Sequence, residues 1–396
     1  MKPRRKVLQI FNRYLEYGGE QGSVFRIGDT LQQVADVEYF TTSSEDLLGK
    51  RGIEDMAAAA AMSMHNPVIT RRLARYQAVG RFDLWQIHNV FPAMSPSVYA
   101  AAFRRGIPVV QYLHNYRMSC TNGYFLNHGE TCTSCIRGNF TKAAVTGCWR
   151  DSRAASGWMG LVLMRLRALG VFRKVSAWVA LSRAQKDLHV RMGIPADRIH
   201  IVPHFFEPAE ELRIAEPGRD VLFLGRLSKE KGASVLLDAW KAAETGQARL
   251  LLAGDGPEGD ALRAKVAAEG IPRVEFLGFV SRDRQEELWR RAAFSVVPSI
   301  WQDPLPTVVF EAWERGRPAV VSDAGGLSDI VEQGVDGLKV PLGDAAELAR
   351  AITRMLSDAT VRTAMAEMGR LKLATHYSKD LWIGRINRVY DAILPP

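Results

Sequence analysis

The sequence VLFLGRLSKEKG, residues 221–232, carries the pattern that decides the fold class of this chain. Four apolar residues lead to a glycine, and two cations, Arg226 and Lys231, follow on the turn before the next helical stretch. A short apolar run that passes through glycine into a helix is typical of a strand in a parallel α/β sheet. Ligands of such sheets bind at the carboxyl ends of the strands, where two cations suit a diphosphate. The alternative for this pair is a solvated surface cluster.

The same alternation of apolar runs and amphipathic helical stretches extends over nearly the whole chain, as expected for parallel strands joined by right-handed crossovers. The first half predicts six strands, at residues 7–11, 38–42, 84–88, 109–113, 177–181 and 200–202. The second half predicts six more, at residues 221–224, 249–253, 274–277, 295–298, 319–322 and 338–340. Helical patterns such as those at 233–243 and 345–356 separate them.

Chain length and a proline-rich join predict two domains. A chain of 396 residues is too long for one ordinary core. Pro203, Pro208 and Pro217 flank an acidic cluster, so the join is expected within residues 203–219. The prediction is therefore one Rossmann-like domain on each side of this join.

The composition is that of a globular protein, with 47% hydrophobic and 24% charged residues. No stretch approaches the roughly 18 consecutive apolar residues of a membrane-spanning helix. The basic start MKPRRKVLQIF fits a buried first strand better than a signal peptide, because its apolar run ends at Asn12 and Arg13. The expected compartment is the cytoplasm.

Two further segments have the residues of a phosphate or sugar site. Gly18 and Gly19 follow the first strand and open a helix, whose N–H groups suit an anion, although a plain tight turn explains them equally well. Asp303 precedes a helix expected to begin near Thr307, and Glu311 lies about one turn into it. Phosphate would contact the N–H groups at the helix start while the carboxylates accept from sugar hydroxyls. The simpler interpretation treats Glu311 as an ordinary charge at a helix N-terminus.

Taken in order, these pieces resemble the retaining GT-B glycosyltransferases of family 4 over nearly the whole chain. The matching features are the Gly18-Gly19 loop, GRLSKEKG, GDGP, LGFV, the acid-x7-Glu pattern and Gly325-Gly326. The resemblance implies an α/β fold of GT-B type, with two Rossmann-like domains facing each other across a deep cleft. It also implies transfer of a sugar from a nucleotide-diphosphate sugar to a hydroxyl group, with retention of anomeric configuration and no cofactor required for catalysis.

The fold of that family also sets the expected domain boundaries. Apolar spacing over residues 376–394 predicts a final helix, which in this fold crosses back onto the first domain. The expected domains are 1–205 plus 377–396 on the acceptor side, and 206–376 for the nucleotide sugar. If the helix instead closes the second domain, the boundaries change and the function does not.

The resemblance assigns a role to each matching residue. Arg226 and Lys231 hold the donor diphosphate and stabilise the leaving nucleoside diphosphate. Asp303, where the family usually has glutamate, faces the transferred sugar, and His114 approaches that sugar from the first domain, with His88 a weaker candidate. The other donor contacts are expected from Glu311 on the ribose, Phe279 and Val280 on the base, and the backbone N–H groups of Leu305, Thr307 and Val308 on the phosphates.

Two departures from the family pattern bear on the identity of the donor. Asp303 is one methylene shorter than glutamate, and Pro304 and Pro306 remove two N–H donors. The resemblance favours a UDP-sugar over GDP-mannose. It favours a saccharide or lipid-linked acceptor, in exopolysaccharide or lipopolysaccharide synthesis.

Other functions fit parts of the same pattern. A nucleotide-sugar epimerase of this fold would act without an acceptor, and a phosphorylase-like enzyme would need a cofactor-lysine context that the sequence lacks. A non-catalytic nucleotide-sugar binding protein stays open because of Asp303, and measurable transfer would exclude it. The net charge of +9 suggests a nucleic-acid-binding protein, but no exposed aromatic stacking motif accompanies it, so no nucleic acid partner is expected.

All four cysteines of the chain fall within the irregular segment 115–150, directly after His114. In a cytosolic protein such clustering favours metal ligation by thiolates over disulfides. Four thiolates with a C-x2-C half-site predict one structural Zn²⁺, held by Cys120, Cys132, Cys135 and Cys148. The alternatives are reduced cysteines in a loop and, less favoured, an iron–sulfur cluster.

The positive charge of the chain is concentrated in residues 137–174, where eight Lys or Arg face one acid and so carry +7 of the +9. A local basic patch predicts a phosphate-rich partner. Its apolar helix over 158–169 is typical of a membrane-interface helix, and a core helix with charged ends explains it equally well. We expect weak, salt-sensitive attachment to the anionic inner face of the cytoplasmic membrane, carried in part by Arg165 and Arg167.

Overall fold

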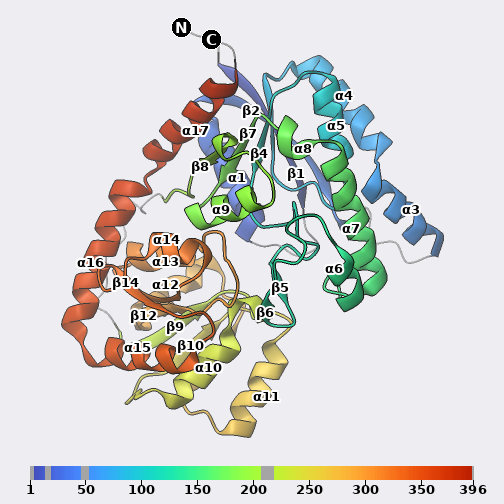
Figure 1. The fold of residues 1–396 in the computed structure, drawn as a ribbon. Coiled ribbons are helices and arrows are strands. Elements are labelled where there is room, and N and C mark those ends of the chain that lie inside the picture. The colour runs from blue at the N-terminus through green and yellow to red at the C-terminus, as the bar shows by residue number, and fades with distance from the viewer. Residues whose placement is uncertain (1–3, 14–18, 46–52, 207–217, 395–396) are drawn as a thin grey trace. The chain divides into compact units, whose positions relative to one another are not determined.

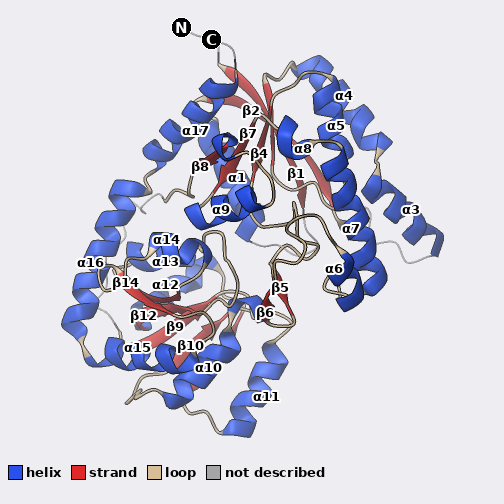
Figure 2. Cartoon of the chain, viewed as in Figure 1, coloured by secondary structure: helices blue, strands red, loops and turns tan. Residues whose placement is uncertain are grey.

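The computed structural model describes residues 4–13, 19–45, 53–206 and 218–394. Two six-stranded sheets of parallel strands dominate it, drawn as red layers with blue helices around them in Figure 2. All twelve strands predicted from the apolar runs are present, each within three residues of its expected bounds. The chain divides into a first unit, residues 1–123, 132–203 and 379–396, and a second unit, residues 124–131 and 204–378.

The sheet of the first unit has the strand order β2-β1-β3-β4-β7-β8. Its strands are β1 (Arg5–Arg13), β2 (Ala35–Ser43), β3 (Leu84–Ile87), β4 (Val109–Tyr112), β7 (Ala177–Ala180) and β8 (Ile199–Ile201). Its helices are α1 (Gly19–Leu31), α3 (Ile53–Met64), α4 (Pro67–Gly80), α5 (Ser97–Arg104), α6 (Thr141–Thr146), α7 (Arg153–Ala168), α8 (Val171–Lys174), α9 (Arg183–Arg191) and α17 (Lys379–Ile393). The direction of strand addition reverses between β1 and β3, which marks the switch point of this sheet.

The predicted C-terminal helix is α17, and it packs within the first unit, as Figure 1 shows in red beside the sheet. Trp382 and Tyr390 of α17 are completely buried. The Tyr390 hydroxyl donates to Gln86 Oε1 on β3 at 2.6 Å, and Arg5 of β1 donates to Asn387 Oδ1 at 3.1 Å. These contacts tie the last helix to the first and third strands.

The sheet of the second unit has the order β11-β10-β9-β12-β13-β14. Its strands are β9 (Asp220–Leu224), β10 (Leu250–Ala253), β11 (Val274–Gly278), β12 (Ala292–Val297), β13 (Ala319–Ser322) and β14 (Gly337–Val340). Its helices are α10 (Ala233–Ala242), α11 (Gly259–Glu269), α12 (Arg282–Arg291), α13 (Val308–Glu314), α14 (Gly325–Ile330), α15 (Ala345–Ser357) and α16 (Ala359–His376). The switch point lies between β9 and β12.

The core of the second unit lies on both faces of its sheet. One apolar cluster joins Leu236 and Leu237 of α10 to Ile352 of α15 and to the central strands, whereas a second joins Trp289 of α12 and Ala312 of α13 to the other face. Central strands of parallel sheets are buried on both faces, which explains why their sequences are continuous apolar runs rather than alternating patterns.

The cysteine-rich segment 115–150 differs from the prediction in one respect. It contains a short antiparallel hairpin, β5 (Leu126–Asn127) with β6 (Glu130–Thr131), and residues 124–131 cluster with the second unit, not the first. The physical reason is an aromatic contact: the Tyr124 ring lies edge-on to the Trp301 ring, with centroids 5.0 Å apart. The boundary between the units falls between Pro203 and His204, two residues before the expected position.

The basic stretch forms α7 and α8, and α7 has a buried face. Met159, Val162, Leu163 and Leu166 are buried, whereas Leu161 and Met164 are 49% and 52% exposed. The core-helix interpretation therefore accounts for most of its apolar residues. Within residues 4–13, 19–45, 53–206 and 218–394, no helix has the length and apolar character needed to cross a membrane.

Candidate functional site

The switch point of the second sheet brings together two loops that are far apart in the sequence. β9 and β12 pair directly, so the loop after β9 (225–232) and the loop after β12 (298–307) leave the same edge of the sheet side by side. Open α/β sheets bind ligands at this position because the loops diverge there. This is the edge to which the sequence assigned the donor.

Lys231 and Asp303 form an ion pair between these two loops. Lys231 Nζ lies 2.6 Å from Asp303 Oδ2, and the two side chains are 29% and 7% exposed. Nζ also lies 5.6 Å from the centroid of the Trp301 ring. Burial opposes the charge of Lys231, but the neighbouring carboxylate of Asp303 outweighs it and raises the pKa of the lysine. Lys231 is therefore a cation at neutral pH, held at the carboxyl edge of the sheet.

Two glycines allow the loops to approach this closely. Gly232 has φ +72°, and a Cβ there would lie 1.9 Å from Pro298 O. Gly325 has φ +56°, and a Cβ there would lie 2.4 Å from Asp303 O. The next residue, Gly326, donates its N–H to that same oxygen at 2.6 Å. The GG pair therefore fixes the backbone that presents the Asp303 carboxylate.

The other predicted donor residues lie around the same edge of the second unit. Arg226 is exposed and follows β9 after one residue, and Glu311 is partly exposed in the first turn of α13. Phe279 is 76% exposed just after β11, with its N–H bound to Asp255 Oδ2 at 2.8 Å. Val280 and Leu305 are buried, at 8% and 6% exposure, and the N-cap of α13 is Thr307, ahead of Val308.

The short helix α13, which follows the loop 298–307, weakens one sequence-based argument. α13 begins at Val308, one residue from the expected start, but it has only seven residues. Few peptide dipoles add up in so short a helix, so its N-terminus contributes little to anion binding. The partly buried cation Lys231 is the stronger candidate for an anion contact at this edge.

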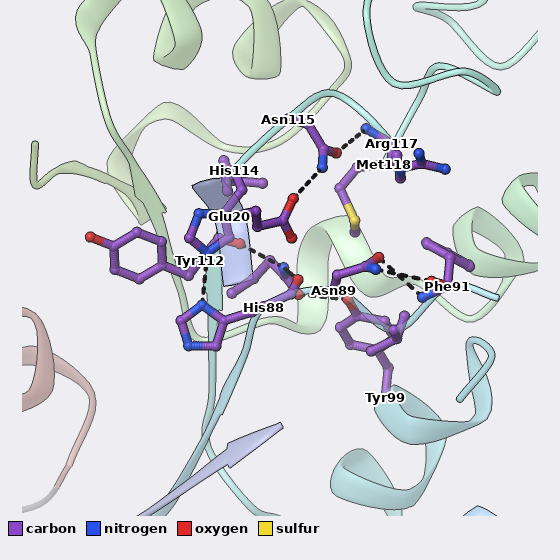
Figure 3. A pocket seen from close by; sticks show the side chains of 13 residues that line it. Glu20, His88, Asn89, Phe91, Tyr99, Tyr112, His114, Asn115, Arg117 and Met118 are labelled. Carbon is purple, nitrogen blue, oxygen red and sulfur yellow. Dashed lines mark hydrogen bonds between the residues drawn. The ribbon is translucent and has the colours of Figure 1, made fainter. Parts of the chain in front are cut away.

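The first unit holds a pocket around two stacked histidines, shown in Figure 3. His88 Nδ1 lies 2.8 Å from His114 Nε2. The Tyr112 ring stacks on both, with centroids 5.3 Å from His88 and 5.0 Å from His114. His88 follows β3 and His114 follows β4, and these strands pair directly, so both side chains reach the carboxyl edge together.

Burial keeps His114 neutral. It lowers the pKa of His114 to about 3, because desolvation disfavours the imidazolium form. Across the 2.8 Å contact one ring donates and the other accepts. A neutral imidazole of this kind can exchange hydrogen bonds with a hydroxyl group at pH 7 without charging.

Sequence reasoning missed the glutamines behind the histidines. Gln9 of β1, Gln86 of β3 and Gln111 of β4 are at most 2% exposed. Gln9 Oε1 lies 2.7 Å from His88 Nε2, and Gln111 Nε2 donates to His88 O at 2.6 Å. The signal was present: VLQIF, LWQIH and VVQYL each place one polar residue inside an apolar strand. Buried amides need partners, so such residues indicate a polar network.

The glycine loop after β1 is partly described. Gly18 lies outside the described residues, whereas Gly19 opens α1, and a Cβ at Gly19 would meet no atom within 4 Å. In the first turn of α1, Glu20 Oε2 accepts from Asn115 Nδ2 at 3.0 Å and lines the histidine pocket.

The four cysteines form no disulfide with one another; Cys120 and Cys135 are buried and Cys132 and Cys148 are partly exposed. Burial, followed by the charges of Cys120, Cys148 and Cys132, raises the pKa of Cys135 to about 12. In the described part of the chain, no three His, Cys, Asp or Glu side chains already have a metal-binding arrangement.

Arg167 connects α7 to the cysteine-rich segment. Its guanidinium donates to Ser119 Oγ and to Ile136 O, both at 2.8 Å, and lies over the Phe172 ring. It holds the cysteine-rich segment against α7, and membrane attachment stays a prediction.

Two family models match consecutive parts of the chain. Residues 49–204 match a glycosyl transferase 4-like domain, and residues 218–358 match the glycosyl transferases group 1. These two segments correspond to most of the first unit and most of the second unit.

Curated relatives and a solved structure point the same way. The chain is 32% identical to alpha-D-kanosaminyltransferase of Streptomyces kanamyceticus, over 52% of this chain and 58% of that protein. It is 26% identical to phosphatidyl-myo-inositol mannosyltransferase of Mycobacterium leprae, over 85% of this chain and 80% of that protein. In four of the curated relatives the matched segment covers 24% to 58% of the relative's own length, so the chain spans about half of the length of these proteins. The Anabaena HepE structure with UDP and glucose aligns with a TM-score of 0.67 at 19% identity, over 98% of this chain and 100% of that chain, which shows the GT-B fold.

Proposed function

Because the chain carries a glycosyltransferase 4-like domain followed by a group 1 glycosyltransferase domain, we propose that it transfers a sugar from a nucleotide-diphosphate sugar to a saccharide or lipid-linked acceptor. The proposed reaction retains the anomeric configuration and needs no metal ion. One observation carries the proposal: a partly buried lysine cation, Lys231, paired with Asp303 at the switch point of the second sheet.

The proposed role of Lys231 is to neutralise the departing nucleoside diphosphate. Arg226, at the end of β9, is the second cation of this role. Preorganised cations stabilise the charge that develops as the glycosidic bond to the diphosphate breaks, which is the task of Mg²⁺ in other transferases. Asp303 holds Lys231 before the donor arrives and then accepts from hydroxyls of the transferred sugar.

The stereochemical course follows from which groups are close to the sugar. The sequence presents no evident carboxylate nucleophile, so we propose front-face attack through an oxocarbenium-like state. Glu311 is assigned to the ribose and exposed Phe279 to the base. The histidine pocket of the first unit is assigned to saccharide hydroxyls, because neutral His114 exchanges hydrogen bonds without taking a charge.

A UDP-sugar is the favoured donor and GDP-mannose the second candidate. HepE, of the same fold, was solved with UDP. A relative named as a phosphatidyl-myo-inositol mannosyltransferase acts on a lipid acceptor, which fits a lipid-linked substrate here. For the membrane, we propose peripheral attachment through exposed Leu161 and Met164 of α7, together with the cations of the basic stretch 137–174.

The donor assignment is tested by a thermal-shift screen of UDP, GDP and their sugar conjugates. A ligand that binds only the folded state raises Tm. Removing one charged partner of a phosphate costs about 1.5–3 kcal/mol, or about 10- to 150-fold in affinity. Lys231→Met, which removes a cation from the phosphates, and Glu311→Ala, which removes the acceptor assigned to the ribose, should therefore each strongly reduce the shift. The matched control is Lys229→Ala, which removes an exposed lysine two residues away.

The reaction is tested by incubating the shifting nucleotide sugar with saccharide and lipid-linked acceptors, with and without EDTA. Glycosylated product that forms in EDTA supports the proposal. Conversion of the nucleotide sugar without any acceptor would instead identify the epimerase. A thermal shift with neither outcome would identify a non-catalytic binding protein. If both site variants bind like the Lys229→Ala control, the site assignment is wrong.

A further inference from the structure

The cysteine-rich segment folds so that distant parts of it meet. The Thr121 hydroxyl lies 3.0 Å from Cys148 Sγ, which places residues 120–121 beside the end of α6. Arg167 bonds to Ser119 and to Ile136, the neighbours of Cys120 and Cys135. Cys132 and Cys135 are joined by a tight turn in which the Ile136 N–H donates to Thr133 O at 3.0 Å. The three chain segments that carry the four cysteines therefore lie next to one another.

The thiols are turned toward local oxygens. Cys120 Sγ lies 2.9 Å from Asn122 Oδ1, and Cys132 Sγ lies 3.5 Å from Ser134 Oγ. This explains why no three ligand-type side chains of the described residues stand in metal-binding positions although the segments that carry the cysteines are adjacent. Rotation about χ1 moves a cysteine sulfur without moving the backbone, so the backbone arrangement and not the thiol rotamers decides whether four sulfurs can meet.

The surroundings of the cluster supply positive charge. Arg167 is half-buried, and burial lowers its pKa, which reflects the cost of desolvating the cation. The hydrogen bonds given for its guanidinium go to uncharged oxygens, those of Ser119, Ile136 and Met192, and among the described residues its Nε has no hydrogen-bond partner. A partly buried cation without an anion is unfavourable unless negative charge lies nearby. Four thiolates around one divalent cation carry a net charge of −2, which Arg167 would offset.

We propose that Cys120, Cys132, Cys135 and Cys148 bind one structural Zn²⁺ in a closed tetrahedral site. Binding converts four thiols to thiolates and releases four protons, with no change of oxidation state. Zn–S bonds of about 2.3 Å leave no open position, so the site takes no substrate. The hydroxyls of Thr121 and Ser134 then donate to thiolates instead of sharing thiol protons.

The site would also close the loop between Cys120 and Cys132. This loop carries Tyr124 and the β5–β6 hairpin, which belong to the second unit through the contact of Tyr124 with Trp301. Trp301 in turn lies under the ammonium group of Lys231. Closing a loop with a metal restricts the conformations of the residues within it. The zinc would therefore restrict the conformations of the loop that carries Tyr124, and the metal site itself is independent of the proposed function.

The test is the zinc content and thiol reactivity of the full-length protein purified under reducing conditions without chelator. We expect about one zinc per chain and four thiols that react with Ellman's reagent only after a chelator removes the metal. Zinc removal should lower Tm by about 5–10 °C. Cys135→Ser should lose the zinc, whereas Thr131→Ser, an exposed neighbour of Cys132, should retain it.

Replacement of the zinc by Co²⁺ keeps the proposal testable if Cys135→Ser does not fold, because a tetrahedral thiolate site gives intense visible d–d and charge-transfer bands in the wild-type chain. Three results would overturn the proposal. They are four freely reactive thiols with less than about 0.1 metal per chain, two disulfides in the native protein, and an iron–sulfur chromophore with matching iron and sulfide. Each is read out without any assay of sugar transfer.

Discussion

The Lys231–Asp303 pair makes a prediction about stability that is separate from activity. Substituting Met for Lys231 keeps the apolar stem but leaves the Asp303 carboxylate, 7% exposed, without its cation. Removing one partner of a buried pair costs about 3–5 kcal/mol, and the 29% exposure of Lys231 reduces this to about 2–3 kcal/mol. Asp303→Asn leaves the more exposed lysine behind and should cost less, about 1–2 kcal/mol.

Differential scanning calorimetry measures these effects, because the two units are expected to unfold in separate transitions. For a domain of this size 1 kcal/mol corresponds to about 2–4 °C, so Lys231→Met should lower the Tm of the second unit by about 4–12 °C. The double variant should be more stable than the sum of the single changes predicts, by about 1–3 kcal/mol. Single effects below about 0.5 kcal/mol that simply add would refute the pairing.

The pH dependence of this pair has a definite sign. The pKa of Lys231 is raised in the folded protein, since the Asp303 carboxylate outweighs the burial that opposes the charge. A raised pKa gives stabilisation that is fully present below the unfolded pKa of about 10.4 and is lost as pH rises through the folded pKa. The difference in Tm between wild type and Lys231→Met, measured by differential scanning calorimetry, should therefore be constant from pH 6 to pH 9.

Three further predictions concern other parts of the two units. Burial lowers the pKa of His114 to about 3, so its contribution to stability is present above about pH 6.5 and is lost as pH falls toward 3. In equilibrium denaturation, His114→Asn should reduce this loss of unfolding free energy at acid pH. An unchanged loss in the variant would contradict the assignment. Gly232→Ala should destabilise the protein by more than about 1 kcal/mol, because the new Cβ would lie 1.9 Å from Pro298 O. The control Gly246→Ala, also at positive φ but with no atom within 4 Å, should cost only about 1 kcal/mol. Equal losses in a denaturant titration would count against the tight loop packing. Tyr390→Phe removes a buried hydroxyl that bonds to Gln86 and should cost about 1–2 kcal/mol in the unfolding transition of the first unit, with no loss expected if α17 does not dock there.

The strands could be predicted from the sequence because parallel strands are buried on both faces and so appear as apolar runs bounded by glycine and proline. β5 and β6 were not predicted, since strands of two residues have no periodicity. The pairing of Lys231 with Asp303, 72 residues apart, depends on β9 lying beside β12, and strand order is not encoded in local pattern. The contact of His88 with His114 was missed for the same reason, although both histidines were recognised singly.

The two competing interpretations of the α7 region show what a sequence pattern leaves open. Apolar residues at 158–169 fit a membrane-facing helix and a core helix equally well, and only the neighbours decide. Phe140 packs so closely on α7 that a Cβ at Gly160 would lie 2.8 Å from the Phe140 Cβ. The buried face of α7 therefore belongs to the protein, and two exposed residues, Leu161 and Met164, remain for a lipid surface.

The most direct test of the central claim is a calorimetric comparison of UDP and uridine binding to the wild-type chain and to Lys231→Met, Arg226→Met and Lys229→Ala. If the diphosphate is held by Lys231 and Arg226, UDP binds far more tightly than uridine to the wild type and to Lys229→Ala. Each of the other two variants then loses about 10- to 150-fold in UDP affinity while uridine binding stays unchanged. Equal UDP affinity in all four proteins would contradict the claim that the edge of the second sheet recognises a nucleoside diphosphate through these two cations.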